Sequence, residues 1–342
     1  MPRIHRLHLA LAAGLLALTA CTSDGDDAGE ASEDAAAQAA ESELRVDVAS
    51  FDLHVGEQQR LLIGVATMDQ GLVAHGEVDI AVGPLDEDEP DQAAITQETT
   101  ASFLPVPGDE PEGGGAQPTV LVGEPGTGVY EARVDLDEPG LWALQVTAEL
   151  ADGTTRTGST VFPQRQPGGL AEEPQVPAVG DEAPRTENLT VDDVDGEEVL
   201  PIMVDSRAGE DSDVPDHHIH DTTIAQAIED GRPVVALFAT PRFCMSRFCG
   251  PITETFADLA EQYDDRAEFV HVEVWRDFDA QELNEAAAEW IQTEHGGNEP
   301  WTFLIDDEGT IIARWDNVLD VEELRTELEQ LPAVTHTEDA GE

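Results

Sequence analysis

Two cysteines, Cys244 and Cys249, are the residues whose type and spacing best suggest chemistry. They stand in the segment Cys-Met-Ser-Arg-Phe-Cys-Gly-Pro. The apolar run 234–238 before them predicts a buried strand, and apolar residues at helical spacing after them predict a helix. The remaining cysteine, Cys21, has a separate explanation, so these two can form the one internal disulfide. A thiol pair at a strand-to-helix junction favours redox chemistry over a structural crosslink.

The four-residue gap between the cysteines constrains where each one lies. Residues five apart in one regular helix have Cα atoms about 8.7 Å apart, whereas a disulfide needs roughly 4.4–6.8 Å. Proline is favoured in a first helical turn, so Pro251 places Cys249 at the helix N-terminus and Cys244 in the preceding loop. A helix N-terminus stabilises a thiolate, and 231–253 carries Arg247 and other arginines but no acid. We therefore expect Cys249 to be the nucleophile and Cys244 the resolving thiol.

The N-terminus has the pattern of an export signal. Arg3 and Arg6 precede a short apolar run that ends in Leu-Thr-Ala-Cys21, which looks like a bacterial lipobox. The resemblance implies that Cys21 is lipidated and that the mature protein is anchored at the outer face of the cytoplasmic membrane, where disulfides persist. An ordinary signal peptide is the alternative. Residues 22–43 are acidic and alanine-rich, which predicts a disordered tether.

The charge of the chain is extreme. It has 74 acidic residues against 16 basic ones, all of them Arg, and a formal net charge of −58. The acids are spread over both halves, as in halophilic proteins, whose acidic surfaces stay soluble at high salt. Nucleic-acid binding needs a basic face and is not expected. A single acidic binding surface is the alternative reading of this composition.

The 342 residues divide by pattern into a multidomain chain. Alternating apolar and polar residues over 130–136 and 142–150, joined by a Pro-Gly turn, predict antiparallel hairpins. About seven such strands suggest an all-β immunoglobulin-like sandwich, with a long loop at 85–118. The predicted organisation is 1–21 signal peptide and lipobox, 22–43 tether, 44–164 sandwich, 165–185 linker, 186–331 second domain, and 332–342 acidic tail.

The second domain resembles the thioredoxin-like superfamily. The resemblance lies in the strand leading to Cys249-Gly-Pro251, in Glu299-Pro300-Trp301, and in the hairpin and helix that follow. It implies an α/β thioredoxin-like domain with a cis peptide before Pro300. It further implies a thiol–disulfide oxidoreductase without a cofactor, in which Cys249 and Cys244 are catalytic and Pro300, Trp301 and Arg247 dock the substrate. Its partners would be protein thiols or disulfides, or a redox partner at the membrane.

Two departures from this family leave alternatives open. The cysteines are four residues apart rather than two, and the strand 234–240 offers no acid or lysine to shuttle protons. The second domain also resembles copper chaperones of the Sco type, which share this fold and a location at the cell surface. This resemblance implies copper binding by Cys244, Cys249 and a remote histidine, His295 or His271. A non-catalytic domain with a structural disulfide is the other alternative. The histidine-rich segment 216–221 is metal-like in composition but is read as a lead-in to the next helix.

Overall fold

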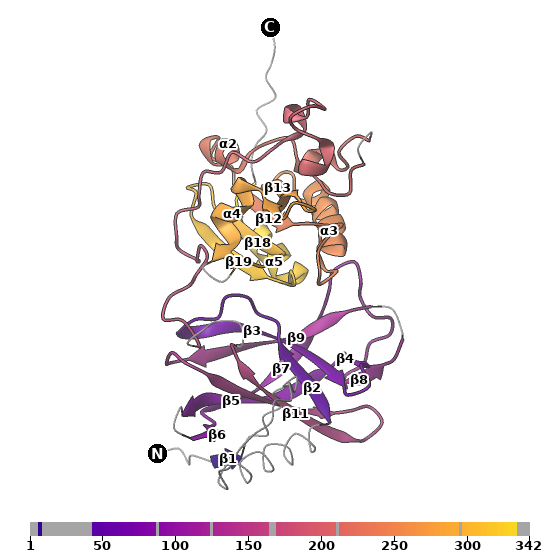
Figure 1. Cartoon of the computed structure of the whole chain (residues 1–342), viewed down its shortest axis with the longest axis vertical. Coiled ribbons are helices and arrows are strands. Elements are labelled where there is room, and N and C mark those ends of the chain that lie inside the picture. The colour runs from indigo at the N-terminus through magenta and orange to yellow at the C-terminus, as the bar shows by residue number, and fades with distance from the viewer. Residues whose placement is uncertain are drawn as a thin grey trace, which may run out of the picture. The chain divides into compact units, whose positions relative to one another are not determined.

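The computed structural model describes residues 6–8, 43–86, 89–123, 126–163, 169–209, 212–293 and 296–333 (Figure 1). The chain separates into two compact units. One comprises Met1–Pro105 and Pro111–Glu173, and the other comprises Val106–Glu110 and Pro174–Glu342. Within the described residues, no helix is long and apolar enough to cross a membrane. The predicted lipidation site Cys21 and nearly all of the predicted tether lie outside the described residues.

The first unit is built from antiparallel strands. Residues at alternate positions of β9 and β10 are buried because successive side chains of a strand point to opposite faces. Long pairings join β3 with β9, β5 with β7, and β10 with both β5 and β11. The strands are β1 (Arg6–His8), β2 (Leu44–Val48), β3 (Gly56–Thr67), β4 (Leu72–Ala74), β5 (Glu77–Asp86), β6 (Glu89–Ala94), β7 (Gln97–Pro105), β8 (Thr119–Leu121), β9 (Gly128–Leu136), β10 (Trp142–Glu149) and β11 (Thr155–Phe162).

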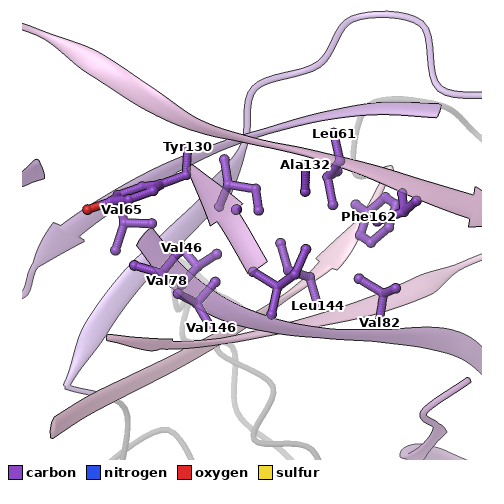
Figure 2. Packing of buried hydrophobic residues seen from close by; sticks show 14 of the residues in the cluster. Val46, Leu61, Val65, Val78, Val82, Tyr130, Ala132, Leu144, Val146 and Phe162 are labelled. Atoms are coloured by element: carbon purple, nitrogen blue, oxygen red, sulfur yellow. The ribbon is translucent and has the colours of Figure 1, made fainter. Parts of the chain in front are cut away.

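The main core of this unit is one large apolar cluster. Side chains from eight strands meet in it, among them Val46, Leu61, Tyr130, Leu144 and Phe162 (Figure 2). The Tyr130 hydroxyl donates to the His75 carbonyl at 2.9 Å. Because side chains of different strands interlock here, the alternating pattern fixes which face of each strand points inward.

The second unit contains a four-stranded sheet in the order β13-β12-β18-β19 (Figure 1). All of β12 is buried, because its two neighbours pair with both edges and helices pack against it. The strands are β12 (Val234–Ala239), β13 (Glu268–Glu273), β18 (Trp301–Ile305) and β19 (Ile311–Asp316), with short pairs β14 (Trp275–Asp277) and β15 (Glu282–Leu283), and β16 (Gln292–Thr293) and β17 (Gly296–Gly297). The helices are α2 (Ile224–Glu229), α3 (Cys249–Gln262), α4 (Glu285–Ile291) and α5 (Val321–Gln330), with 3₁₀ turns η1 (Val191–Asp193), η2 (Pro201–Met203) and η3 (His217–Ile219).

Local sequence explains where these helices begin. Asp320 caps α5 by accepting from the backbone N–H groups of Glu322 and Glu323. Asn284 caps α4 in the same way through Ala286. A side-chain oxygen before the first turn satisfies N–H groups that have no partner within the helix.

The expected fold class, an immunoglobulin-like sandwich followed by an α/β thioredoxin-like domain, is wrong for this chain. The structure is mostly β, with 39% strand and 17% helix, and its described residues form four α-helices. The four-stranded sheet is antiparallel except for the β12–β13 pair, so a strand–helix–strand crossover occurs there once. Much of 174–223 forms 3₁₀ turns and irregular chain. The loop expected at 85–118 is also wrong, because β6 and β7 lie within it.

Candidate functional site

The Cys244–Cys249 disulfide lies between the end of β12 and the start of α3. Cys249 is the first residue of α3, and the two Cα atoms are 6.0 Å apart. The Cys244 N–H donates to the Thr240 carbonyl at 3.1 Å, which folds the loop back toward the helix. Arg247, at a left-handed φ of 66°, completes this turn by donating its N–H to the Cys244 carbonyl at 3.3 Å. The predicted pairing is confirmed, and so is the placement of Cys244 before the helix.

The two sulfurs differ in accessibility. Cys249 is fully buried, whereas Cys244 is partly exposed. Ser246 Oγ lies 3.1 Å from Cys244 Sγ. Met245 beside it is 96% exposed, as an apolar side chain seldom is, and Arg247 is exposed too. Cys244 is therefore the sulfur that another protein could reach.

A carboxyl group lies against the buried sulfur. Glu299 Oε2 is 3.8 Å from Cys249 Sγ. Burial raises the pKa of Glu299, against hydrogen bonds from Thr240 and Trp275 that favour its charged form. The site therefore places a carboxyl group with a raised pKa beside the buried sulfur of the disulfide.

A second acid, Glu273, lies behind the first. Burial raises its pKa to about 8, and the charge of Glu299 adds to this effect. The Thr240 hydroxyl donates to Glu273 Oε1, and the Ser206 N–H donates to Oε2 at 2.8 Å. Thr240 therefore links the two carboxyl groups at the end of β12.

Sequence reasoning missed these acids because it looked for one only in 234–240. The signal was available in Val-His-Val-Glu-Val at 270–274, where two ionisable residues alternate with apolar ones in a predicted strand. Such a pattern puts His271 and Glu273 on one face of β13. Both side chains are buried, and a buried polar side chain needs a hydrogen-bond partner.

The residues predicted to dock the substrate differ in how exposed they are. The Glu299–Pro300 peptide is cis, as predicted. Trp301 is 3% exposed and stacks on Phe303, so a bound substrate would not contact its side chain directly. Arg247 lies at the surface beside Cys244. The surface near the disulfide also carries Phe243, stacked on Phe278.

A second polar cluster, which sequence reasoning did not assemble, consists of Asp205, His220 and His271. All three side chains are fully buried. His220 Nε2 lies 2.8 Å from His271 Nδ1, and Asp205 Oδ2 lies 3.5 Å and 3.9 Å from these two nitrogens. We name it the His-His-Asp cluster. The residues come from the turn after η2, the end of η3 and the middle of β13, so no local sequence motif predicts the cluster.

The charges in this cluster follow from burial. Burial lowers the pKa of His220 to about 3 and also lowers that of His271, so both rings are neutral. Burial opposes the ionisation of Asp205, but the hydrogen bonds and positive charge of Arg207 favour its charged form and hold its pKa below the usual value. Arg207 donates to both carboxylate oxygens of Asp205, at 2.6 Å to Oδ2, and to Asp216 at 2.8 Å. The cluster is thus an ionised carboxylate beside two neutral imidazoles.

Two groups of side chains in the described residues could hold a metal ion. One is the His-His-Asp cluster, and the other is Cys244, Cys249 and Glu299. The histidine predicted to complete a copper site with the cysteines, His295, lies outside the described residues. The alternative histidine, His271, belongs to the His-His-Asp cluster. The third donor that the structure places at the thiols is therefore a carboxylate.

No protein-family model and no curated protein matched this sequence. The function must accordingly be argued from the chemistry of these two sites.

Proposed function

We propose that the protein carries out thiol–disulfide exchange through Cys244 and Cys249. The observation that carries the proposal is a disulfide at a helix N-terminus in which one sulfur is accessible and the other lies 3.8 Å from a carboxyl group. A purely structural crosslink needs neither feature. The surrounding loop adds exposed arginines and Met245, which suit a protein substrate.

Accessibility favours assigning the attack to Cys244, the reverse of the roles expected from helix position alone. In the reduced protein, the Cys244 thiolate attacks a substrate disulfide, forms a mixed disulfide and releases one substrate thiolate. The Cys249 thiolate then attacks the Cys244 sulfur, and the second substrate thiolate leaves. Two electrons pass to the substrate, and the Cys244–Cys249 disulfide forms. The same steps in reverse oxidise a substrate dithiol.

Glu299 supplies a route for the proton. Cys249 must lose its proton before it attacks the mixed disulfide, and Glu299 Oε2 lies within reach of its sulfur. Burial raises the pKa of Glu299, which makes this carboxyl group a better proton acceptor than an exposed one. Glu299 would thus take the proton-transfer role for which the strand before the cysteines offers no acid.

The proposed location is the outer face of the cytoplasmic membrane, where a lipid on Cys21 would anchor the protein. It rests on the Leu-Thr-Ala-Cys21 sequence. Substrates would be protein thiols or disulfides in that oxidising compartment, or a membrane redox partner.

Trapping of mixed disulfides tests the exchange and the roles of the two thiols. Cys249→Ser should accumulate mixed disulfides through Cys244, because the resolving thiol is absent, whereas Cys244→Ser should trap few. The matched control is Ser246→Ala, which keeps both sulfurs. The opposite pattern would restore Cys249 as the attacking thiol. A reduction potential below about −300 mV, with no trapping in either variant, would identify a structural disulfide and refute the proposal.

Copper delivery is the second candidate, favoured by the convergence of two sulfurs and a carboxylate in one place. Soft thiolates select Cu(I), and the sulfurs are available only after reduction. Titration of the reduced protein with Cu(I) tests it, with Glu299→Gln and His295→Ala as variants. Tight binding that needs both cysteines would support copper binding, and binding that survives Cys244→Ser with Cys249→Ser would exclude these residues as the site.

A further inference from the structure

The hydrogen-bond partners of the His-His-Asp cluster determine where the ring protons lie. His220 Nδ1 lies 3.1 Å from the Asp216 carbonyl, and His271 Nε2 lies 3.0 Å from the Ala239 carbonyl. A backbone carbonyl only accepts, so each of these nitrogens carries the proton of its ring. In a neutral imidazole the other nitrogen then has a lone pair. The two remaining nitrogens, His220 Nε2 and His271 Nδ1, are the ones that face each other.

With the ring protons on the outer nitrogens, two imidazole nitrogens and one carboxylate oxygen converge as acceptors. The two lone-pair nitrogens are 2.8 Å apart, and Asp205 Oδ2 completes the triangle at 3.5 Å and 3.9 Å. Facing lone pairs repel, and in a buried site no bulk water relieves them. A cation at the centre of the triangle would accept a lone pair from each of the three atoms and remove the repulsion between them.

The distances and the outer contacts fit a metal ion. A tetrahedral ion with bonds to imidazole and carboxylate holds its ligand atoms about 3.3–3.5 Å apart. The three observed separations lie on both sides of this value, so sub-ångström shifts would make them equal. Metal-bound histidines usually donate their other N–H to a carbonyl or carboxylate, as both rings do here. Arg207 orients Asp205 from outside, because its Nε and Nη2 groups both donate to Oδ2.

We propose that Asp205, His220 and His271 bind a divalent first-row transition-metal ion, with Zn²⁺ as the reference ion. Two imidazoles and one carboxylate are borderline ligands, which suit Zn²⁺, Co²⁺ or Cu²⁺ better than Cu(I), Ca²⁺ or Mg²⁺. The site is distinct from the disulfide and uses none of its residues. Because its ligands come from separate segments and are fully buried, the ion would act structurally, joining the turn at Asp205 and the end of η3 to β13.

Cobalt titration tests the site with the full chain, oxidised, stripped of metal by a chelator and free of any histidine tag. Co²⁺ is the probe, since its visible spectrum reports coordination by nitrogen. Excess Mg²⁺ in molar salt occupies the acidic surface. We expect one equivalent of Co²⁺ to bind and to be displaced by Zn²⁺. His220→Gln and His271→Gln should each weaken binding at least about 100-fold, since even outer contacts of metal ligands contribute 10- to 100-fold.

Three controls locate the ion. His217→Gln changes a neighbouring exposed histidine in η3 and should bind as the wild type does. Cys244→Ser with Cys249→Ser removes the sulfurs and should also bind. If circular dichroism shows that a histidine variant does not fold, Asp205→Asn replaces it as the ligand variant, because it preserves the shape of the side chain. It should weaken cobalt binding. The proposal is overturned if the wild type shows no saturable cobalt spectrum, if folded His220→Gln and His271→Gln still bind, or if binding is lost in either the His217 or the folded cysteine control.

Discussion

Replacing Glu299 by Gln tests the role of the carboxyl group beside Cys249. In the reduced protein, a carboxylate and a thiolate would lie about as far apart as the 3.8 Å between Glu299 Oε2 and Cys249 Sγ. Two unit charges at that separation repel by about 4 kcal/mol at an effective dielectric constant of about 20. That energy corresponds to about 3 pH units in the ionisation of a thiol. The pair should therefore share one proton rather than ionise independently.

Glu299→Gln should accordingly lower the pH at which Cys249 ionises, by between about 1 and 3 units. The assay follows the ultraviolet absorbance of the thiolate against pH in a Cys244→Ser background, which leaves one thiol at the site. High salt should be kept constant, because the chain carries many acids. Glu254→Gln is the matched control, since it removes an exposed carboxylate from the same helix, α3. A midpoint that stays the same or rises in Glu299→Gln would refute the coupling between these two groups.

Three further predictions follow from burial, charge and the N-terminal sequence. Because burial raises the pKa of Glu273 from 4.5 to about 8, the folded state keeps a proton that the unfolded state releases between these values. This contribution to stability is therefore lost as pH rises through that window, by at most about 1.4 kcal/mol per pH unit. In urea unfolding with a chelator present, Glu273→Gln should reduce the fall in unfolding free energy with rising pH. An unchanged dependence on pH would contradict a protonated Glu273 in the folded state. With a net charge of −58, the thermal midpoint should rise from low to molar salt as repulsion is screened, and a constant midpoint would count against a halophilic surface. Mass spectrometry of the mature N-terminus should find a lipid on Cys21, whereas an unmodified terminus would exclude the anchor.

The sequence allowed prediction of features that depend on neighbouring residues. The strand 234–238, the disulfide and the helix beginning at Cys249 all follow from local patterns and from the reach of a disulfide. The hairpins of the first unit follow from alternation of apolar residues. The β6–β7 region was missed because its acids and prolines resemble a loop, whereas pairing with β5 and β9 makes it strand.

The residues around the sites were harder to predict because they are distant in sequence. Glu299 lies 50 residues from Cys249, and His271 lies 51 residues from His220. Each of them alone is an ordinary core or surface residue, and only the sheet brings them together. The fold class was wrong for a related reason. Element order suggested alternating α and β layers, but strand direction depends on pairings that no local pattern specifies.

The register between β12 and β13 has a consequence for both sites. In this parallel pair, Leu237 lies opposite His271 and Ala239 lies opposite Glu273. The Ala239 carbonyl accepts from His271, and Thr240, the next residue, donates to Glu273. A slip of one residue would turn both side chains to the opposite face of the sheet. Local opening of this strand pair would therefore release the histidine cluster and the acids behind the disulfide in a single cooperative event, and hydrogen exchange at the two sites should proceed at matching rates.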